Sequence, residues 1–190
     1  GRRLITSSYS IIIGIGIQLL IRAKSWIKYL SIDKERVKVL SKTESQFDQV
    51  AEEYDFVSSL LNDYSFFLSN MTTKKNRALD IGCGTGLLVE KLAEYYDEVV
   101  GIDISNQMLN IAIAKRKLPN TFYLKMDAGM LNFNEKFDYI VSRTTFHHLH
   151  NVSDVIQQMK NLLNEDGKIV ILDNVSEVET PPTYVYILGA

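Results

Sequence analysis

The sequence has little cysteine and little histidine, and these shortages exclude several kinds of site. Only one of the 190 residues is cysteine, Cys83, which excludes an internal disulfide and a metal site built from several cysteines. The three histidines lie together at positions 147, 148 and 150, with no cysteine or carboxylate at ligand spacing beside them. We therefore expect no metal ion. Internal repeats and low-complexity segments are also lacking, and a chain of this length has room for one domain with a full core.

Charge of both signs is present, but it is distributed unevenly. Residues 1–42 carry nine Lys or Arg and two acidic residues, a net charge of +7, whereas residues 43–190 carry 12 and 21, a net charge of −9. We predict a basic and apolar arm over 1–42 and a separate acidic domain over 43–190. A basic arm suggests an anionic surface as partner. The acidic domain disfavours a nucleic acid, because it offers no broad face for phosphates.

The arm contains a stretch without any charge, from residue 4 to residue 21. Its 18 residues are at the short end of what a membrane-spanning helix needs, and serine, threonine and glutamine dilute its hydrophobicity. Three interpretations stay open: a membrane-associated helix, an element packed on the domain, or a segment without fixed structure. A basic helix pattern follows over 26–40, so residues 4–40 predict contact with a membrane surface. No small-residue cleavage site of a secretory signal follows, and we expect a cytoplasmic protein.

The domain alternates helix and strand patterns. A capping box at Thr43 and Gln46 opens an amphipathic helix. Buried strands are expected at 78–81, 98–103, 121–126, 137–142 and 168–173, with helices from 87, from 106 and over 152–163. Such alternation implies right-handed crossovers. The fold class predicted is α/β, a doubly wound, Rossmann-like and mostly parallel sheet with helices on both faces.

A glycine loop directly follows the first of these strands. Leu79 to Gly86 read L-D-I-G-C-G-T-G, which places glycines at 82, 84 and 86. Glycine permits positive φ and lets a ligand approach the backbone, and the helix that follows offers unpaired N–H groups. The alternative is a tight turn that binds nothing. The spacing differs from the G-x-G-x-x-G of dinucleotide sites, which disfavours a nicotinamide-dependent oxidoreductase.

An aspartate ends the second strand. Asp103 lies 17 residues after Gly86, and ligands of α/β sheets bind at the carboxyl ends of strands, where a carboxylate can accept both ribose hydroxyls. Helix capping is the alternative role, but Ser105 or Asn106 already serves the next helix. We therefore predict that Asp103 binds a ribose.

Together these motifs resemble the class I S-adenosylmethionine-dependent methyltransferases over residues 44–175. The resemblance rests on L-D-I-G-C-G-T-G, on G-I-D-I-S at 101–105, on Asp127-Ala128, and on F-D-Y-I-V-S followed by H-H-L at 147–149. The helix F-D-Q-V-A-E-E-Y-D at 47–55 is similar to one in the small-molecule branch that includes quinone-biosynthesis methyltransferases. Members of this class usually continue beyond the fifth strand with a helix and two strands. We therefore expect an incomplete domain with its last strands missing.

The resemblance implies S-adenosylmethionine as cofactor and a small-molecule acceptor, and the apolar and basic arm suggests that this acceptor is lipophilic. It places Asp80 near the ammonium group of the methionine part and the loop of Gly82, Gly84 and Gly86 beneath that part. Ile104 and Met108 would enclose the adenine, Asp127 and the Ala128 N–H would read its edge, and Tyr54 would close over the site. Carboxylates accept hydrogen bonds from ammonium, amino and hydroxyl groups, so these assignments are chemically sensible.

The acceptor's chemistry decides whether a base is needed. A sulfonium methyl is already activated, so a base is required only when the acceptor is protonated, as a phenol or an acidic carbon would be. His147 and His148 follow the fourth strand, near the expected acceptor, and are candidate catalytic bases, with core packing as the alternative. A non-catalytic domain that binds the cofactor or acts as a scaffold is the alternative function.

Overall fold

The computed structural model describes residues 41–174 and 183–189, except positions 43, 57 and 59–62. By internal contacts the chain divides into two units, Gly1–Lys42 and Thr43–Ala190. The predicted arm, with its uncharged segment 4–21 and its basic helix 26–40, lies outside the described residues apart from Ser41 and Lys42, and so does the capping residue Thr43. Within the described part, no helix has the length and apolar character needed to cross a membrane. Membrane contact through 4–40 therefore stays a prediction.

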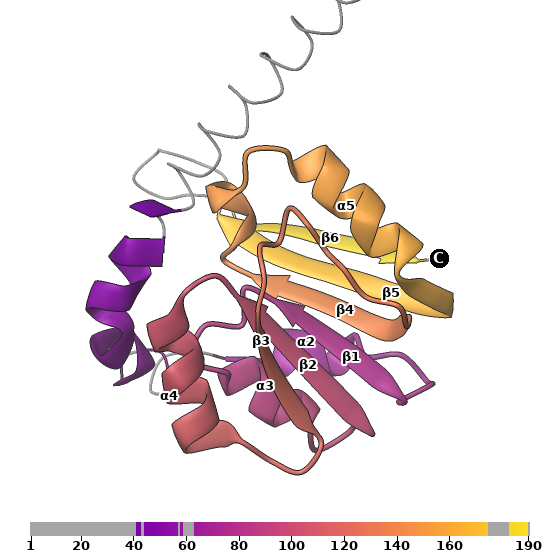
Figure 1. Ribbon diagram of the computed structural model, residues 1–190. Coiled ribbons are helices and arrows are strands. Elements are labelled where there is room, and N and C mark those ends of the chain that lie inside the picture. Colours follow the sequence, from indigo (N-terminus) through magenta and orange to yellow (C-terminus); the bar gives the residue numbers. More distant parts are fainter. Residues whose placement is uncertain (1–40, 43, 57, 59–62, 175–182, 190) are drawn as a thin grey trace, which may run out of the picture. The chain divides into compact units, whose positions relative to one another are not determined.

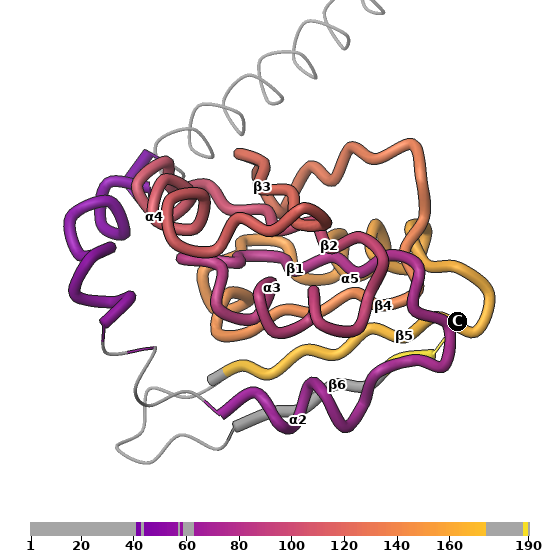
Figure 2. The backbone as a smooth tube through the Cα atoms, turned by 90° about the horizontal axis from the view of Figure 1, so that it is seen from below, coloured from indigo at the N-terminus to yellow at the C-terminus, as the bar shows by residue number. Residues whose placement is uncertain are grey.

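Six strands in the described part of the second unit form one sheet, in the order β3-β2-β1-β4-β5-β6 (Figure 1). The first five are parallel, and β6 runs antiparallel to β5. Figure 2 shows them following one another in this order across the layer. The predicted α/β, Rossmann-like class is confirmed. The strands are β1 Arg77–Ile81, β2 Glu98–Asp103, β3 Thr121–Lys125, β4 Phe137–Arg143, β5 Leu163–Asn174 and β6 Thr183–Gly189.

Helices cover both faces of the sheet. Since successive side chains of a strand point to opposite sides, each strand contributes side chains to a buried cluster on each face. On β1, Ala78 packs in one buried cluster, whereas Leu79 and Ile81 pack in the other. The first cluster is completed by side chains of α2, α3 and α4, and the second by side chains of α5. The helices are α2 Ser65–Ser69, α3 Leu87–Leu92, α4 Asn106–Arg116 and α5 Val152–Asn161, with a 3₁₀ turn, η1, at Phe146–His148.

Residues 41–42 and 44–56 are also helical, so the predicted helix is present, but helix already occurs before Thr43 and the capping box does not mark its start. Ala51 is buried in a small cluster with Met108 and Ile111 of α4, and Phe47 packs against it. Asp48 binds the start of α4, where its carboxylate accepts from the Ser105 hydroxyl and from the Gln107 N–H. This helix therefore packs on α4 through its apolar face.

The C-terminal part corrects the prediction. We expected the strands beyond β5 to be missing, but β6 pairs with β5 from Lys168↔Gly189 to Asn174↔Thr183. The fifth strand is therefore not an unpaired edge. It also begins five residues earlier than predicted, at Leu163, and its Asp166 has a φ of 65°. Because β5 is paired with β4 on one side and β6 on the other, its backbone N–H and C=O groups are not left free to pair with another chain and cause aggregation.

Candidate functional site

The glycine loop joins β1 to α3 at the carboxyl edge of the sheet. The N–H groups of Gly82 and Cys83 both donate to the Ile102 carbonyl of β2, at 2.9 Å, so the loop is fixed to the neighbouring strand. Gly82 has a φ of 73°, and a Cβ at this position would lie 2.1 Å from Thr145 Oγ1. Only glycine fits such a close approach without displacing the chain after β4.

Asp103 lies beside this loop and is held by it. One carboxylate oxygen accepts from the Gly84 N–H at 2.8 Å and the other from the Ser105 N–H at 2.9 Å. Burial raises the pKa of Asp103, and these backbone hydrogen bonds oppose the rise. The carboxylate can still accept further hydrogen bonds. Ser105 caps α4 by accepting from the Met108 N–H, so Asp103 is not itself the cap.

Asp80 is buried, with 2% of its surface exposed. Burial and the nearby charge of Asp103 raise the pKa of Asp80 to about 8, and Arg143 opposes the rise. A carboxyl group in this condition gains strongly from a cation placed beside it. Asp80 lines a hollow over the loop together with Tyr54, Tyr64, Gly82, Gly84 and Arg143, among others.

Two further predicted residues lie over the loop. A Cβ at Gly84 would be 3.8 Å from Tyr54 Cε1 and 4.0 Å from Met108 Sδ, so both side chains border this glycine. Tyr54 is 36% exposed and Met108 is buried. The tyrosine comes from the helix at 44–56, and the methionine from α4.

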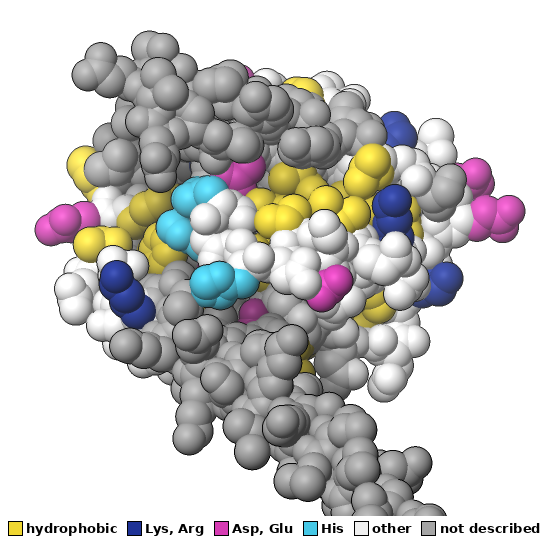
Figure 3. Space-filling view, turned by 90° about the horizontal axis from the view of Figure 1, so that it is seen from above, with side chains coloured by type: hydrophobic (Ala, Val, Ile, Leu, Met, Phe, Trp, Pro, Cys, Tyr) yellow, Lys and Arg dark blue, Asp and Glu magenta, His cyan; other side chains and the backbone are white. Residues whose placement is uncertain are grey.

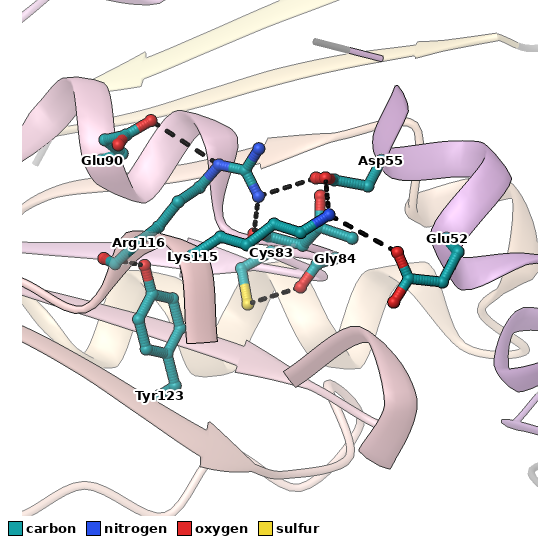
Figure 4. A network of polar contacts seen from close by, with 9 residues as sticks. Glu52, Asp55, Cys83, Gly84, Glu90, Lys115, Arg116 and Tyr123 are labelled. Carbon is teal, nitrogen blue, oxygen red and sulfur yellow. Dashed lines mark hydrogen bonds and ion pairs between the residues drawn. The ribbon is translucent and has the colours of Figure 1, made fainter. Parts of the chain in front are cut away.

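Ion pairs fasten the helix at 44–56 to α4 (Figure 4). The carboxylate of Asp55, the residue after Tyr54, forms two ion pairs. Its Oδ1 lies 2.7 Å from Arg116 Nη1, and its Oδ2 lies 2.8 Å from Lys115 Nζ. Arg116 also donates to the Thr85 carbonyl of the glycine loop at 3.0 Å. Burial would raise the pKa of Asp55, but the bonds from Lys115, Thr85 and Arg116 outweigh it and lower that pKa. The position of Tyr54 over the loop is thus tied to a buried ion pair.

The remaining predicted residues lie near Asp103 but not in the described lining of the hollow. The Met126 N–H donates to the Asp103 carbonyl at 3.0 Å, which brings Asp127 and Ala128 to the end of β2. Asp127 accepts from the Gly129 N–H at 2.8 Å, and Ala128 packs against the second buried cluster. Ile104 is half-buried between Asp103 and Ser105.

The histidines follow β4 in η1. His147 Nδ1 lies 2.6 Å from an oxygen of Asp173, which is 3% exposed at the end of β5. The His148 ring meets Phe47 edge-on at 5.2 Å between centroids. Burial and the neighbouring His147 lower the pKa of His148. Histidine side chains gather at the surface on one face (Figure 3), and the chain's three histidines all belong to 147–150.

This geometry agrees with comparisons to known proteins. A family model described as "Methyltransferase domain" matches residues 79–171. An uncharacterized methyltransferase of Staphylococcus carnosus is 35% identical over 144 residues, which cover 70% of this chain and 68% of the relative. The chain belongs to the class I S-adenosylmethionine-dependent methyltransferases.

Other relatives and structures place this methyltransferase in a broad group. An uncharacterized methyltransferase of Alkaliphilus oremlandii is 32% identical, over 72% of this chain and 61% of the relative. A structure of a Haloferax volcanii protein in complex with the Trm112 methyltransferase activator has a TM-score of 0.64 at 20% identity, covering 69% of this chain and 60% of its own. The DhpI complex with S-adenosylhomocysteine has a TM-score of 0.63 at 15% identity, covering 80% of both chains. The two structures show the fold, and S-adenosylmethionine is the cofactor of the family.

The methyltransferase site also contains residues that the sequence reading missed. Arg143 lines the hollow at the end of β4, and Asp173 meets His147 at the end of β5. Both could have been found by the rule that identified Asp103, since each comes at the carboxyl end of a buried strand. No group of three or more His, Cys, Asp or Glu in the described part is arranged to hold a metal ion.

Proposed function

We propose that this chain transfers a methyl group from S-adenosylmethionine to a small acceptor that reacts through oxygen. The observation that carries the proposal is the pairing of the buried carboxyl group of Asp80 with the half-buried carboxylate of Asp103 around a glycine loop on adjacent strands. S-adenosylmethionine supplies the methyl group on a positively charged sulfur. A bare backbone loop beside two carboxylates fits such a cation, and no phosphate is involved.

We propose the following contacts to the cofactor. Asp80 accepts from the ammonium group, and Arg143, in the same hollow, pairs with the carboxylate of the methionine part. The free lone pairs of Asp103 accept the ribose hydroxyls. Ile104 and Met108 enclose the adenine, Asp127 and the Ala128 N–H read its edge, Gly82, Gly84 and Gly86 form the floor, and Tyr54 closes over it.

The acceptor class is supported by two relatives. The ubiquinone biosynthesis O-methyltransferase of Pelagibacter ubique is 30% identical, over 70% of this chain and 55% of the relative. The malonyl-[acyl-carrier protein] O-methyltransferase of Bacillus cereus is 30% identical, over 50% of this chain and 36% of the relative. Both are named for transfer to oxygen. The Pelagibacter relative supports the quinone-biosynthesis branch. The uncharged segment 4–21, with its basic flanks, supports a lipophilic acceptor at a membrane surface.

The residues act mainly by alignment. Holding acceptor and methyl group in one geometry can lower the barrier by roughly 7–11 kcal/mol at best. A hydroxyl acceptor must also lose its proton, and His147 or His148 is the proposed base. Both follow β4, whose end borders the hollow through Arg143.

The test is methyl transfer from labelled S-adenosylmethionine, with the intact chain and a lipid extract as acceptor. We expect labelled lipid and an equal amount of S-adenosylhomocysteine. Label confined to aqueous metabolites would contradict the lipophilic acceptor. Cofactor binding without S-adenosylhomocysteine formation across phenols, enols, amines and lipids would contradict catalysis and favour the non-catalytic alternative.

A further inference from the structure

Asp173 is a buried carboxylate that binds η1 through both of its oxygens. One oxygen accepts from the Phe146 N–H at 2.5 Å and from the His147 N–H at 3.3 Å. The other lies 2.6 Å from His147 Nδ1. A carboxylate with 3% of its surface exposed needs such donors, because burying a charge is costly unless it is hydrogen-bonded. The start of η1 and the ring of His147 are therefore fixed by the same side chain.

This contact determines which ring nitrogen of His147 carries the proton. An ionised carboxylate only accepts hydrogen bonds, so Nδ1 must be the donor. In a neutral imidazole the other nitrogen, Nε2, then has a free lone pair. The side chain of His147 is 37% exposed, which leaves room for a partner at Nε2.

The residues just before His147 are anchored to two neighbouring elements. At its start, the Thr145 side chain lies against Gly82 of the cofactor loop. Thr144 has a φ of 51°, an uncommon value for a residue other than glycine, and its N–H donates to the Leu172 carbonyl of β5 at 2.9 Å. Strained residues of this kind persist where the surroundings hold them, which is frequent at functional sites.

The structure also separates the two histidines that the sequence left equivalent. The His148 ring lies 3.9 Å from the His147 ring between centroids and packs edge-on against Phe47. Burial and His147 lower the pKa of His148, although Asp173 opposes the change, so the proton affinity of His148 is reduced. The ring of His147, by contrast, is hydrogen-bonded to the carboxylate of Asp173.

We infer that Asp173 is a positioning residue that holds His147 with Nε2 bare, so that His147 takes a proton from an enol or phenol hydroxyl. This inference rests on the proposed function. Nε2 accepts the hydroxyl proton while the oxygen forms a bond to the methyl carbon and the carbon–sulfur bond breaks. The sulfur leaves as a neutral thioether, and the proton passes from His147 to water. Acceptors that are already anionic, such as thiolates, need no such step.

The test is the tautomer of His147 in the full chain, read from long-range ¹H–¹⁵N spectra of the histidine rings at pH 7.5. His147→Gln identifies the resonances. We expect a proton on Nδ1 in the wild type and on Nε2 in Asp173→Asn, because the new amide N–H₂ donates where the carboxylate accepted. A proton on Nε2 in the wild type would overturn the inference, and so would the same tautomer in both proteins. The wild-type spectrum decides without any variant.

Turnover supplies a second readout, with a phenol and an aromatic thiol as acceptors. Asp173→Asn and His147→Gln should each lower kcat for the phenol about 100-fold or more and leave the KM of the cofactor unchanged. The double variant should lose no more than either single variant, since the two act as one unit. Asp166→Asn is the control on the same strand, because its side chain is 78% exposed and asparagine tolerates positive φ. An equal loss for the thiol would overturn the role of His147 as base.

The inference and the proposed function fail in distinguishable ways. S-adenosylhomocysteine binding is measured on the same labelled sample by adding the ligand. Absence of binding would overturn the proposed function whatever the tautomer. Binding together with the wrong tautomer would overturn only the role of Asp173.

Discussion

The proposed contact between Asp80 and the cofactor predicts that cofactor binding depends on pH. Its pKa of about 8 means that the free protein holds this carboxyl largely protonated at neutral pH, because burial and Asp103 disfavour its charge. In the proposed contact, the ammonium group of the cofactor pairs with the ionised form of Asp80. Binding therefore has to displace a proton, and the dissociation constant should fall as the pH rises.

The magnitude follows from the ionised fraction. A group with a pKa of about 8 is about 1% ionised at pH 6.0 and about 24% ionised at pH 7.5, so affinity should improve about 25-fold between them. A carboxyl with the ordinary value of 3.8 would change affinity less than about twofold over this range.

The assay is calorimetric titration of S-adenosylhomocysteine at both pH values, in buffers of different ionisation enthalpy that reveal the released proton. Asp80→Asn is the matched control, because the amide has no charge to titrate and titration of the ligand appears equally in both proteins. We expect a steep profile in the wild type and a flat one in the variant. Equal profiles in the two proteins would refute the reasoning.

The same pKa has a consequence for stability. The folded value lies above the unfolded one, so the folded state binds the proton more tightly between about pH 4 and pH 8. The free energy of unfolding should therefore fall as the pH rises through this range. Denaturant titrations should show that Asp80→Asn removes part of this slope. An unchanged slope would contradict a raised pKa.

Three further predictions concern the loop, the ion pair and the hollow. Gly82→Ala should lower the free energy of unfolding in urea by about 2–5 kcal/mol, because Gly82 has a positive φ and an added Cβ would clash with Thr145. Gly189→Ala is the control and should be nearly neutral, since an added Cβ would meet nothing within 4 Å. Similar losses for the two variants would contradict the close approach of Gly82 and Thr145. Asp55→Asn should destabilise the fold by about 3 kcal/mol, because the buried Arg116 loses the carboxylate nearest to it, while the exposed Glu52→Gln should change the stability by less than about 0.5 kcal/mol; equal effects would contradict a stabilising buried ion pair. Arg143→Gln should weaken S-adenosylhomocysteine about tenfold or more and leave methylthioadenosine, which lacks the amino-acid part, unaffected; equal loss for both ligands would contradict the carboxylate contact.

Much of the sheet and one edge of the site could be predicted from the sequence. Buried strands in an α/β chain show as short apolar runs, and a polar residue at the end of such a run marks the ligand edge. This rule predicted Asp103 at the end of β2, whereas Asp80 was predicted only through the family resemblance; β1 and β2 are neighbours in the sheet. It would also have found Arg143 and Asp173, had it been applied to every strand.

Other features depend on contacts between distant segments. Asp55 looks like a solvated residue within its helix pattern, and only packing brings it to Lys115, 60 positions away, and to Arg116. The pairing of His147 with Asp173 depends on the register of β4 with β5 in the same way. The strand β6 is a different case: residues 183–188 are rich in β-branched and aromatic side chains, a signal that our prediction did not use.

The central claim is that the carboxylates at the ends of β1 and β2 bind S-adenosylmethionine. Calorimetric titration of this cofactor into the wild type and into Asp103→Asn tests it most directly, with Asp97→Asn as an exposed acidic control. We predict one site in the wild type and in the control, and binding weakened about 10- to 150-fold in Asp103→Asn, the cost of losing hydrogen bonds to a charged acceptor. No binding to the wild type, or equal affinity in all three proteins, would contradict the claim.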